Sequence, residues 1–435
     1  MEKALKNVIV VTYYWPPAGG PGVQRWVGLT RYFEENGLHP IVVIPKNAAY
    51  PQLDERLRDF VSKSIEFIQV PILEPTRWAQ RLGFSKVKDY SKGSLPQSPK
   101  GFVERFLFYI RGQLFIPDSR VFWIRPLKRT LFKRLKQGDI EAVITTGPPH
   151  SVHLAMLGLI RKPDFKKVKW IADFRDPWTE IGYHKPLNLN QRTLIRHQKL
   201  ERQVLKGAHL VLTTTNTLAT HYRQVYQANV ATITNGFSTY YERPKVEQTK
   251  IFNILHVGSL FEHRNPVAFW QALSELRTEG MLKAVNIRIQ FLGEVSKSTR
   301  QSLEQAKLLD YCDFEGYVPK HEIEKFVQRT SLLLLCEGQD EAYEFAVPGK
   351  LYDYLAMNIP ILAIGPKRWE LANLVEGQDD ISVVTHDQKE SMKAFISCAL
   401  LRFEGQSQVL RTERDVERFE HQYLSKQLAF LIERL

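Results

Sequence analysis

The stretch VIVVTYYWPPAGGPG (residues 8–22) decides the fold, because a strand pattern and a glycine-rich turn stand directly before a helix pattern. Residues 8–13 form a continuous apolar, β-branched run, which is typical of a strand buried on both faces. Residues 23–35 have apolar side chains at helical spacing and end at an Asn-Gly C-cap signal. A second strand is expected at 40–44. The stretch therefore predicts a βαβ unit with parallel strands.

The same order of elements returns in the second half of the chain, which predicts a second α/β domain. Its first strand is expected at 252–257, its first helix at 267–279 and its next strand at 287–292. Further strands are expected at 313–318, 332–336, 361–364 and 381–384, with helices at 321–329, 349–357 and 369–376. The first half continues with strands at 142–145, 169–172, 210–213 and 231–234. We therefore expect an α/β protein of two doubly wound, Rossmann-like domains.

The predicted domain boundary lies in 235–250, where neither the strand period nor the helix period is present. Residues 1–240 are then an N-terminal domain and residues 250–415 a C-terminal domain. A terminal helix within 416–435 is expected to pack back on the N-terminal domain. The length agrees, since 435 residues at about 150 per domain allow two or three domains.

Charge is divided unevenly along the chain. The sequence has 60 Lys and Arg against 47 Asp and Glu, a formal net charge of +13. Residues 1–245 hold 38 basic and 19 acidic side chains, a balance of +19, and the rest of the chain carries −6. Basic residues interleave with aromatic ones in an insertion at about 85–138, so an anionic partner must be considered for this half.

The three cysteines, Cys312, Cys336 and Cys398, show no CxxC spacing, which indicates a reducing compartment and neither a zinc site nor a redox pair. No window approaches the ~18 apolar residues of a membrane span. We expect a cytoplasmic protein. Its basic insertion either lies on the inner face of an anionic membrane or forms a small core surrounded by solvated charges.

Three motifs of the N-terminal domain stand at predicted strand ends, where open α/β sheets bind ligands. Gly19, Gly20 and Gly22 let backbone N–H groups approach a phosphate, although the spacing is not GxGxxG and a plain connection is the alternative. His150, in TTGPPHSVH, contacts a ligand or caps the next helix. Asp176, in ADFRDPW, belongs to a structural ion-pair network, orients His150 or accepts a substrate hydroxyl.

Two motifs of the C-terminal domain indicate an anion site. In HVGSLFEHRN, Gly258 follows a strand, and Arg264 is able to neutralise a diphosphate. In PGKLYDYLAMNIPILA, a Pro-Gly turn opens a helix on which Lys350 and Asp353 share a face. Asp353 is suited to a ribose diol and Lys350 to a diphosphate.

Together these segments resemble the GT-B glycosyltransferases, and specifically the retaining family 4 of bacterial surface-polysaccharide biosynthesis. The resemblance spans nearly the whole chain and rests on YYWPPAGGPG, TTGPPHSVH, ADFRDPW, TNGF, HVGSLFEHRNP, FLGE, FEGYVP and PGKLYDYLAMNIPILA. It implies the GT-B fold, in which two Rossmann-like domains face each other across a cleft.

The resemblance also implies a donor-binding set of Gly258, Ser259, Arg264, Glu344, Lys350, Leu351 and Asp353. Asp353 takes the second acidic position of the family's donor helix, which meets the donor ribose. Glu344 is the nearest residue for the first acidic position, but it is one residue out of register and Phe345 stands at the regular place.

Two further departures concern the diphosphate. Ser259 and Asn265 stand where many family members carry Arg and Lys, which leaves Arg264 and Lys350 for this role. His150 resembles the family's histidine near the transferred sugar. The candidate catalytic residues are His150, Asp176 and Arg264.

The implied reaction moves a sugar from a nucleotide-diphosphate donor to a hydroxyl of a glycan or lipid-linked acceptor, with retention of configuration. The leaving diphosphate assists deprotonation of the acceptor, so no protein nucleophile, cofactor or metal ion is implied. A nucleotide-sugar epimerase of the same fold stays open. A nucleic-acid-binding protein would suit the charge of +13 but lacks a recognised motif.

Overall fold

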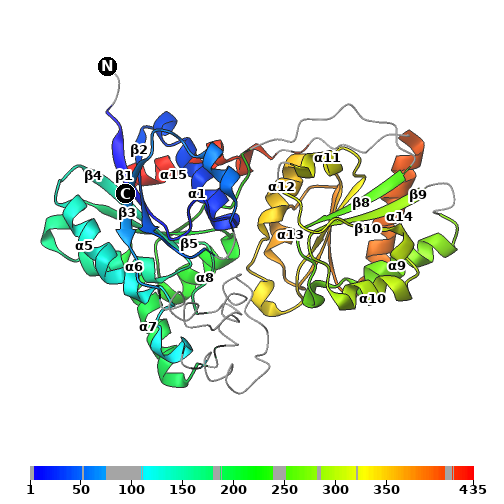
Figure 1. Ribbon diagram of the computed structural model, residues 1–435, viewed down its shortest axis with the longest axis horizontal. Helices are drawn as coiled ribbons and strands as arrows, with labels where there is room; N and C mark the ends of the chain where they lie inside the picture. Colours follow the sequence, from blue (N-terminus) through cyan, green and yellow to red (C-terminus); the bar gives the residue numbers. More distant parts are fainter. Residues whose placement is uncertain are drawn as a thin grey trace. The chain divides into compact units, whose positions relative to one another are not determined.

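The computed structural model describes residues 4–50, 53–74, 109, 111–179, 187, 189–238, 251–281, 286–319, 322–406, 414 and 416–435 (Figure 1). The chain divides into two compact units, unit 1 (Met1–Ser238 with Phe419–Leu435) and unit 2 (Thr239–Arg418). The segment 239–250 of the predicted boundary and residues 85–108 of the basic insertion lie outside the described residues.

Unit 1 contains a parallel sheet with the strand order β3-β2-β1-β4-β5-β6-β7. The strands are β1 (Lys6–Val11), β2 (Leu38–Lys46), β3 (Glu66–Pro71), β4 (Ile140–Gly147), β5 (Lys169–Phe174), β6 (Leu210–Thr213) and β7 (Val230–Thr232). The helices are α1 (Pro21–Arg31), α5 (Ile124–Leu135), α6 (Ser151–Ile160), α7 (Gln191–Gly207), α8 (Asn216–Tyr226) and α15 (His421–Arg434).

Strand β1 explains why the opening run is apolar throughout. Val8 and Val10 belong to one hydrophobic core, whereas Ile9 and Val11 belong to a second core on the other face of the sheet. Side chains of a strand alternate between the two faces, so a central strand covered on both sides needs apolar residues at every position.

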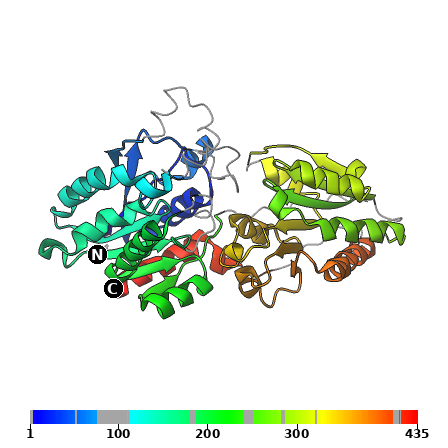
Figure 2. The same cartoon turned by 90° about the horizontal axis from the view of Figure 1, so that it is seen from below.

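The terminal helix α15 lies in unit 1, among the blue and green elements of Figures 1 and 2. Leu424, Leu428 and Ile432 enter the same core as Trp26 of α1. Gly28 allows the two helices to approach closely, since a Cβ at this position would lie 2.3 Å from the His421 ring. Helix α15 therefore completes the core on one face of the sheet.

Unit 2 contains a parallel sheet with the strand order β10-β9-β8-β11-β12-β13. The strands are β8 (Ile251–Val257), β9 (Asn286–Leu292), β10 (Cys312–Phe314), β11 (Leu332–Cys336), β12 (Ile361–Gly365) and β13 (Ile381–Thr385). The helices are α9 (Val267–Thr278), α10 (Lys297–Gln305), α11 (Ile323–Val327), α12 (Gly349–Met357), α13 (Glu370–Leu374) and α14 (Lys389–Gln406).

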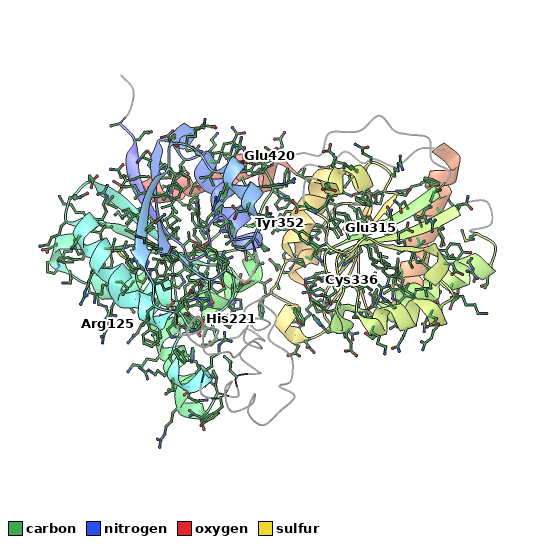
Figure 3. The ribbon with its side chains drawn as sticks, viewed as in Figure 1. Arg125, His221, Glu315, Cys336, Tyr352 and Glu420 are labelled. Carbon is green, nitrogen blue, oxygen red and sulfur yellow. The ribbon has the colours of Figure 1, made fainter. Side chains whose placement is uncertain are left out.

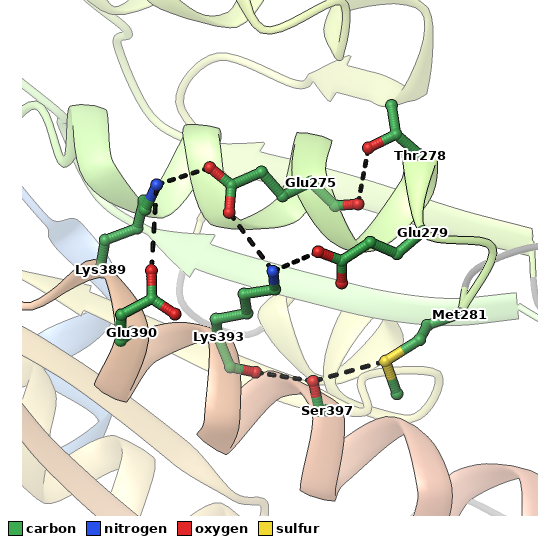
Figure 4. Close-up of polar contacts among 8 residues, drawn as sticks. All are labelled: Glu275, Thr278, Glu279, Met281, Lys389, Glu390, Lys393 and Ser397. Carbon is green, nitrogen blue, oxygen red and sulfur yellow. Dashed lines mark hydrogen bonds and ion pairs between the residues drawn. The ribbon is translucent and has the colours of Figure 1, made fainter.

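Helices α9 and α14 pack together and are joined by ion pairs at their solvent edge (Figure 4). Lys389 meets Glu275 at 2.5 Å, and Lys393 lies between Glu275 and Glu279. Because these groups are in contact with water, they contribute little beside the apolar core that the two helices share.

The predicted doubly wound fold is confirmed, with differences at element ends. The strand expected at 313–318 stops at Phe314, because Gly316 adopts a positive φ of 67° that an extended strand does not use. The helix expected at 23–35 ends at Arg31 and is followed by a separate 3-10 turn, Glu34–Asn36. Strand β3 was not expected, since as an edge strand it buries only Val70 fully.

Candidate functional site

The order of the strands in unit 2 locates its ligand-binding edge. Strands β8 and β11 are neighbours, and the chain winds outward from β8 to β10 and from β11 to β13. Ligands of open α/β sheets bind at the carboxyl ends of the two strands where the winding direction reverses. Here those ends lead to Gly258 and to Glu337, and Figure 3 labels Cys336, the last residue of β11.

Two glycines bring the backbone after β8 close to its neighbours. Gly258 has a positive φ of 92°, and a Cβ there would lie 2.7 Å from Cε and Nζ of Lys350. Gly293, at the end of β9, would bring a Cβ to 2.4 Å from the carbonyl carbon of Gly258. The backbone at Gly258 therefore requires a second glycine beside it, Gly293, which is part of the FLGE motif.

Lys350 lies over Gly258 in the first turn of α12, whose N-cap position is Pro348. Within the described residues, its ammonium group has no hydrogen bond and no ion pair. Burial and the nearby Arg264 guanidinium lower the pKa of Lys350 to about 8, while Glu337 acts in the opposite direction. An ammonium without a partner at a helix N-terminus is suited to an anionic ligand.

Arg264 stands in the 3-10 turn Glu262–Arg264 after β8. Its Nε lies 2.7 Å from Oε1 of Glu337, a carboxylate that is almost completely buried. The same Oε1 accepts a hydrogen bond from the backbone N–H of Gly338 at 3.0 Å. The predicted diphosphate ligand Arg264 therefore already holds an anionic group, which the sequence analysis did not anticipate.

The remaining residues of α12 divide into core and edge. Leu351 is completely buried, so its side chain is part of the core. Asp353 is half-buried, one turn after Lys350. Tyr354 accepts a hydrogen bond from the Val257 N–H at 2.9 Å and donates one to the Leu334 carbonyl at 3.3 Å. It thereby fixes α12 to both central strands, a role that its sequence position does not reveal. Tyr352, on the same helix, is labelled in Figure 3.

Ser259 follows Gly258 and is half-buried. Glu344 contacts Nε of Arg368 at 3.3 Å, and that arginine side chain is 77% exposed. Glu344 is therefore engaged with a solvated residue rather than with Lys350 or Arg264.

In unit 1 the winding reverses between β1 and β4. His150 follows β4 at the N-cap position of α6, but its side chain does not cap the helix. Asp118 does so by accepting hydrogen bonds from N–H and Oγ of Ser151. The His150 ring is buried and stacks on Trp178, with 5.0 Å between ring centroids and 1° between planes.

Two further residues of these motifs, His153 of α6 and Asp173 of β5, are structural. His153 is completely buried and bonds to Thr145, and burial lowers its pKa to about 3. Asp173 is completely buried and forms an ion pair with Arg25 at 3.1 Å. Its second oxygen accepts a hydrogen bond from Nε1 of Trp26 at 2.9 Å. Asp173 therefore anchors α1 to the sheet and is not available to orient His150.

Arg175 and the glycine-rich turn lie together. Gly19 and Gly20 precede α1, and Gly20 has a positive φ of 108°. A Cβ on Gly22, in the first turn of α1, would lie 1.7 Å from Nη1 of Arg175. Asp176 is half-buried, and burial raises the pKa of its carboxyl group.

A second network at the end of β1 was missed by the sequence analysis. The Tyr13 hydroxyl donates to the buried carboxylate of Glu74, which also accepts a hydrogen bond from the Ala49 N–H at 2.7 Å. Arg120 lies 3.3 Å from Glu74 and covers the Tyr13 ring. Because the partners are far apart in sequence, no local motif indicates this network.

The described residues contain neither a metal-binding cluster nor a membrane-spanning helix. No group of three or more His, Cys, Asp or Glu side chains in this part of the chain is placed to hold a metal ion. No helix in the same residues has the length and apolar character needed to cross a bilayer.

Solved structures with the same architecture include glycosyltransferases. WaaG, a glycosyltransferase involved in lipopolysaccharide biosynthesis, is 13% identical, with 98% of this chain and 99% of that chain covered and a TM-score of 0.53. A TarM variant from S. aureus in complex with fondaparinux, alpha-GlcNAc-glycerol and UDP is 10% identical. The match covers 99% of this chain and 98% of that chain, with a TM-score of 0.53. The fold is GT-B.

Proteins of this fold are not all transferases. A Listeria monocytogenes protein described as a UDP-N-acetylglucosamine 2-epimerase is 10% identical, covers 99% of this chain and 96% of its own, and has a TM-score of 0.52. No protein-family model and no curated protein sequence matches the chain. The likeness to these structures therefore establishes the fold, whereas a fold by itself does not determine the reaction.

Proposed function

We propose that the protein is a glycosyltransferase that moves a sugar from a nucleotide-diphosphate donor to a hydroxyl of a glycan or lipid-linked acceptor. The observation that carries this proposal is the Lys350 ammonium over Gly258, at the ligand-binding edge of unit 2, which has no hydrogen bond or ion pair with any residue that the structure describes. A diphosphate supplies the negative charge that this position lacks. Transferases among the proteins of like fold, and the UDP bound to one TarM variant, support the same class of ligand.

In this proposal the donor binds to unit 2. Lys350 and Arg264 contact the diphosphate, the backbone at Gly258 and Ser259 approaches it closely, and Asp353 accepts hydrogen bonds from the ribose diol. The charge that develops on the leaving diphosphate is stabilised by the two cations. Retention of configuration follows if that diphosphate removes the proton of the acceptor hydroxyl, so that no protein nucleophile and no metal ion takes part.

The acceptor binds to unit 1 in the same proposal. His150 is held in one orientation by the Trp178 stack, and because its ring nitrogens are closed to solvent, its contact with the sugar at transfer requires the ring to be uncovered when the acceptor binds. Burial raises the pKa of Asp176, and its carboxyl group follows β5, where it is placed to form a hydrogen bond with a substrate hydroxyl. Gly19, Gly20 and Gly22 bring the N-terminus of α1 to a phosphate of the bound ligands.

We further propose that the basic part of unit 1 rests on the inner face of an anionic membrane. Helix α5, in the described part of the basic insertion, buries Leu127, Leu131 and Leu135 in the core. Its opposite face exposes Arg125, Arg129 and Lys133, and Figure 3 labels Arg125 on the outside of the unit. Cations spaced along one helix face are suited to anionic headgroups.

Vesicle sedimentation tests this part of the proposal. The protein should sediment at low salt with vesicles containing phosphatidylglycerol and not with pure phosphatidylcholine. Replacing Arg125, Arg129 and Lys133 by Glu should abolish sedimentation. Equal sedimentation of this variant would contradict the membrane proposal while leaving the transfer reaction untouched.

The proposed function itself is tested by thermal shift with nucleoside diphosphates and nucleotide sugars of uracil, guanine, adenine and thymine. The ligands of one base should raise the melting temperature of the wild type. Asp353→Ala should abolish this increase, because the carboxylate that contacts the ribose is removed. Glu376→Ala, a change at an exposed residue of the same unit, should keep it. If no ligand stabilises the wild type, the transferase proposal fails.

An epimerase of the same fold is the second candidate, favoured only by the Listeria protein. The two activities are distinguished by incubating the protein with the stabilising nucleotide sugar and no acceptor. An epimerase converts the sugar under these conditions, whereas a transferase leaves it unchanged or slowly hydrolyses it.

A further inference from the structure

Glu337 is a deeply buried carboxylate at the ligand-binding edge of unit 2, and only 5% of its surface is exposed. It is the first residue after β11, and its N–H continues the strand ladder by donating to the Ile364 carbonyl at 2.9 Å. Its backbone is therefore fixed by the sheet, so the carboxylate is held at a defined place beside the predicted diphosphate ligands.

The two oxygens of this carboxylate are used differently. Oε1 receives both protein contacts, from Nε of Arg264 at 2.7 Å and from the Gly338 N–H at 3.0 Å. Oε2 has no hydrogen bond or ion pair with any described residue. Oε2 is also not among the fully buried polar atoms that have no partner, so it keeps some contact with solvent.

An aromatic surface adjoins the carboxylate. The Tyr343 ring packs on Gly338, where a Cβ would lie 2.5 Å from the ring. His263 is stacked on Tyr343 with centroids 5.9 Å apart and an angle of 11°, and Phe261 continues the stack at 6.3 Å. Only a glycine at position 338 allows this ring to lie directly beside Glu337.

A carboxylate oxygen beside an aromatic face matches the chemistry of a sugar ring. Sugar hydroxyls donate to the carboxylate, and the C–H face of the ring packs on the aromatic surface. Arg264 contacts Oε1 of the same carboxylate, so the group that carries the hydroxyls must lie next to the group that carries the negative charge. This order of groups is that of a sugar diphosphate.

We propose that Glu337 and Tyr343 form the donor-sugar subsite, and that Glu337 supplies the carboxylate for the sugar hydroxyls in place of Glu344. The inference rests on the proposed function, since it places the sugar of the same donor. Glu344, by contrast, contacts the solvated Arg368 and adjoins neither cation. This proposal explains why Glu344 stands one residue away from the family's regular acidic position. The carboxylate for the sugar comes from the end of β11 instead.

The test compares two ligands in matched variants of the full chain by isothermal titration calorimetry. The ligands are the nucleoside diphosphate and the nucleotide sugar of one base, for example UDP and UDP-glucose or GDP and GDP-mannose. Glu337→Gln should lower the affinity for the nucleotide sugar about 10-fold or more, since a hydrogen bond to a charged group is lost. The affinity for the nucleoside diphosphate should stay the same or increase, because a negative charge beside Arg264 is removed.

Glu344→Gln is the matched control and should change neither affinity. Tyr343→Leu keeps an apolar side chain but removes the aromatic face, and it should weaken only the nucleotide sugar, which keeps the test valid if Glu337→Gln does not fold. An equal change for both ligands in Glu337→Gln and Tyr343→Leu would overturn the inference. Absence of binding to the wild type would instead refute the proposed function.

Discussion

The ligand-binding edges of the two units differ in how their charged groups are engaged. In unit 1, Asp173 of β5 is paired with Arg25, and Glu74 is paired with Arg120, both inside the protein. In unit 2, between β8 and β11, the Lys350 ammonium has no partner within the described residues. Asp173 and Glu74 are thus paired without a ligand, whereas the described residues give the Lys350 ammonium no direct ion-pair partner.

This difference has an energetic meaning. Paired buried charges stabilise a fold only as pairs, because each partner left alone in the interior costs several kcal/mol. An unpaired ammonium group costs stability in the free protein, and that cost is relieved when an anion binds. Substitutions at the two edges should therefore change stability in opposite directions.

The largest effect is expected for Asp173→Ala. It leaves the Arg25 guanidinium and the Trp26 N–H buried without their acceptor, so unfolding in urea should lose about 3–5 kcal/mol. Tryptophan fluorescence follows both units, with Trp26, Trp170 and Trp178 in the core of unit 1 and Trp270 and Trp369 buried in unit 2. Asp164→Ala, at an exposed acidic residue of the same unit, serves as the control. A loss below about 1 kcal/mol would show that Asp173 is not an anchor.

A smaller effect of opposite sign is expected for Lys350→Met. Methionine keeps the length of the side chain and removes the unpaired charge, so the free protein should gain about 1–2 kcal/mol. The measurement is the urea midpoint of unit 2 without ligand. Destabilisation by this variant would mean that Lys350 has a structural partner.

The pH dependence of the unfolding free energy should also reflect the charge of Lys350. The pKa of Lys350 is about 8 in the folded protein, below its usual value of 10.5, so the unfolded chain binds more protons between these two values. Wild-type stability measured relative to Lys350→Met should therefore rise as the pH increases from 8 to 10.5. A constant difference across this window would contradict the lowered pKa.

The smallest effect on stability is expected for Gly22→Ala in unit 1. The new methyl group collides with the end of the Arg175 side chain, which is flexible and able to move away. Alanine also favours the helix, so the net change in the unfolding free energy should stay within about 0.5 kcal/mol. If Arg175 and this turn hold the acceptor, the KM for the acceptor should rise while stability is unchanged. An unchanged KM would remove them from the acceptor site.

The sequence predicted the buried elements best. Strand 332–336 and helix 349–357 have the predicted bounds, because a continuous apolar run and a Pro-Gly start are local signals. Strand β3 escaped prediction, since an edge strand with exposed residues lacks the pattern of a buried one.

The candidate site was predictable only in part, for a related reason. Gly258 and Lys350 stand out by residue type beside a strand end or a helix start. The contacts of Glu337 with Arg264, of Tyr343 with His263 and of Trp178 with His150 join segments that are far apart along the chain. One sequence contains no local signal for such contacts, so they came from the structure alone.

The most direct test of the central claim is calorimetric titration of a nucleoside diphosphate into the wild type and into Lys350→Met at pH 7. We predict binding to the wild type and an affinity at least about 10-fold weaker in the variant, because a charge-assisted contact to phosphate is lost. Wild-type affinity should also fall as the pH rises through about 8, the pKa of Lys350. Equal affinity of the two proteins would contradict the claim that this edge of unit 2 is an anion site.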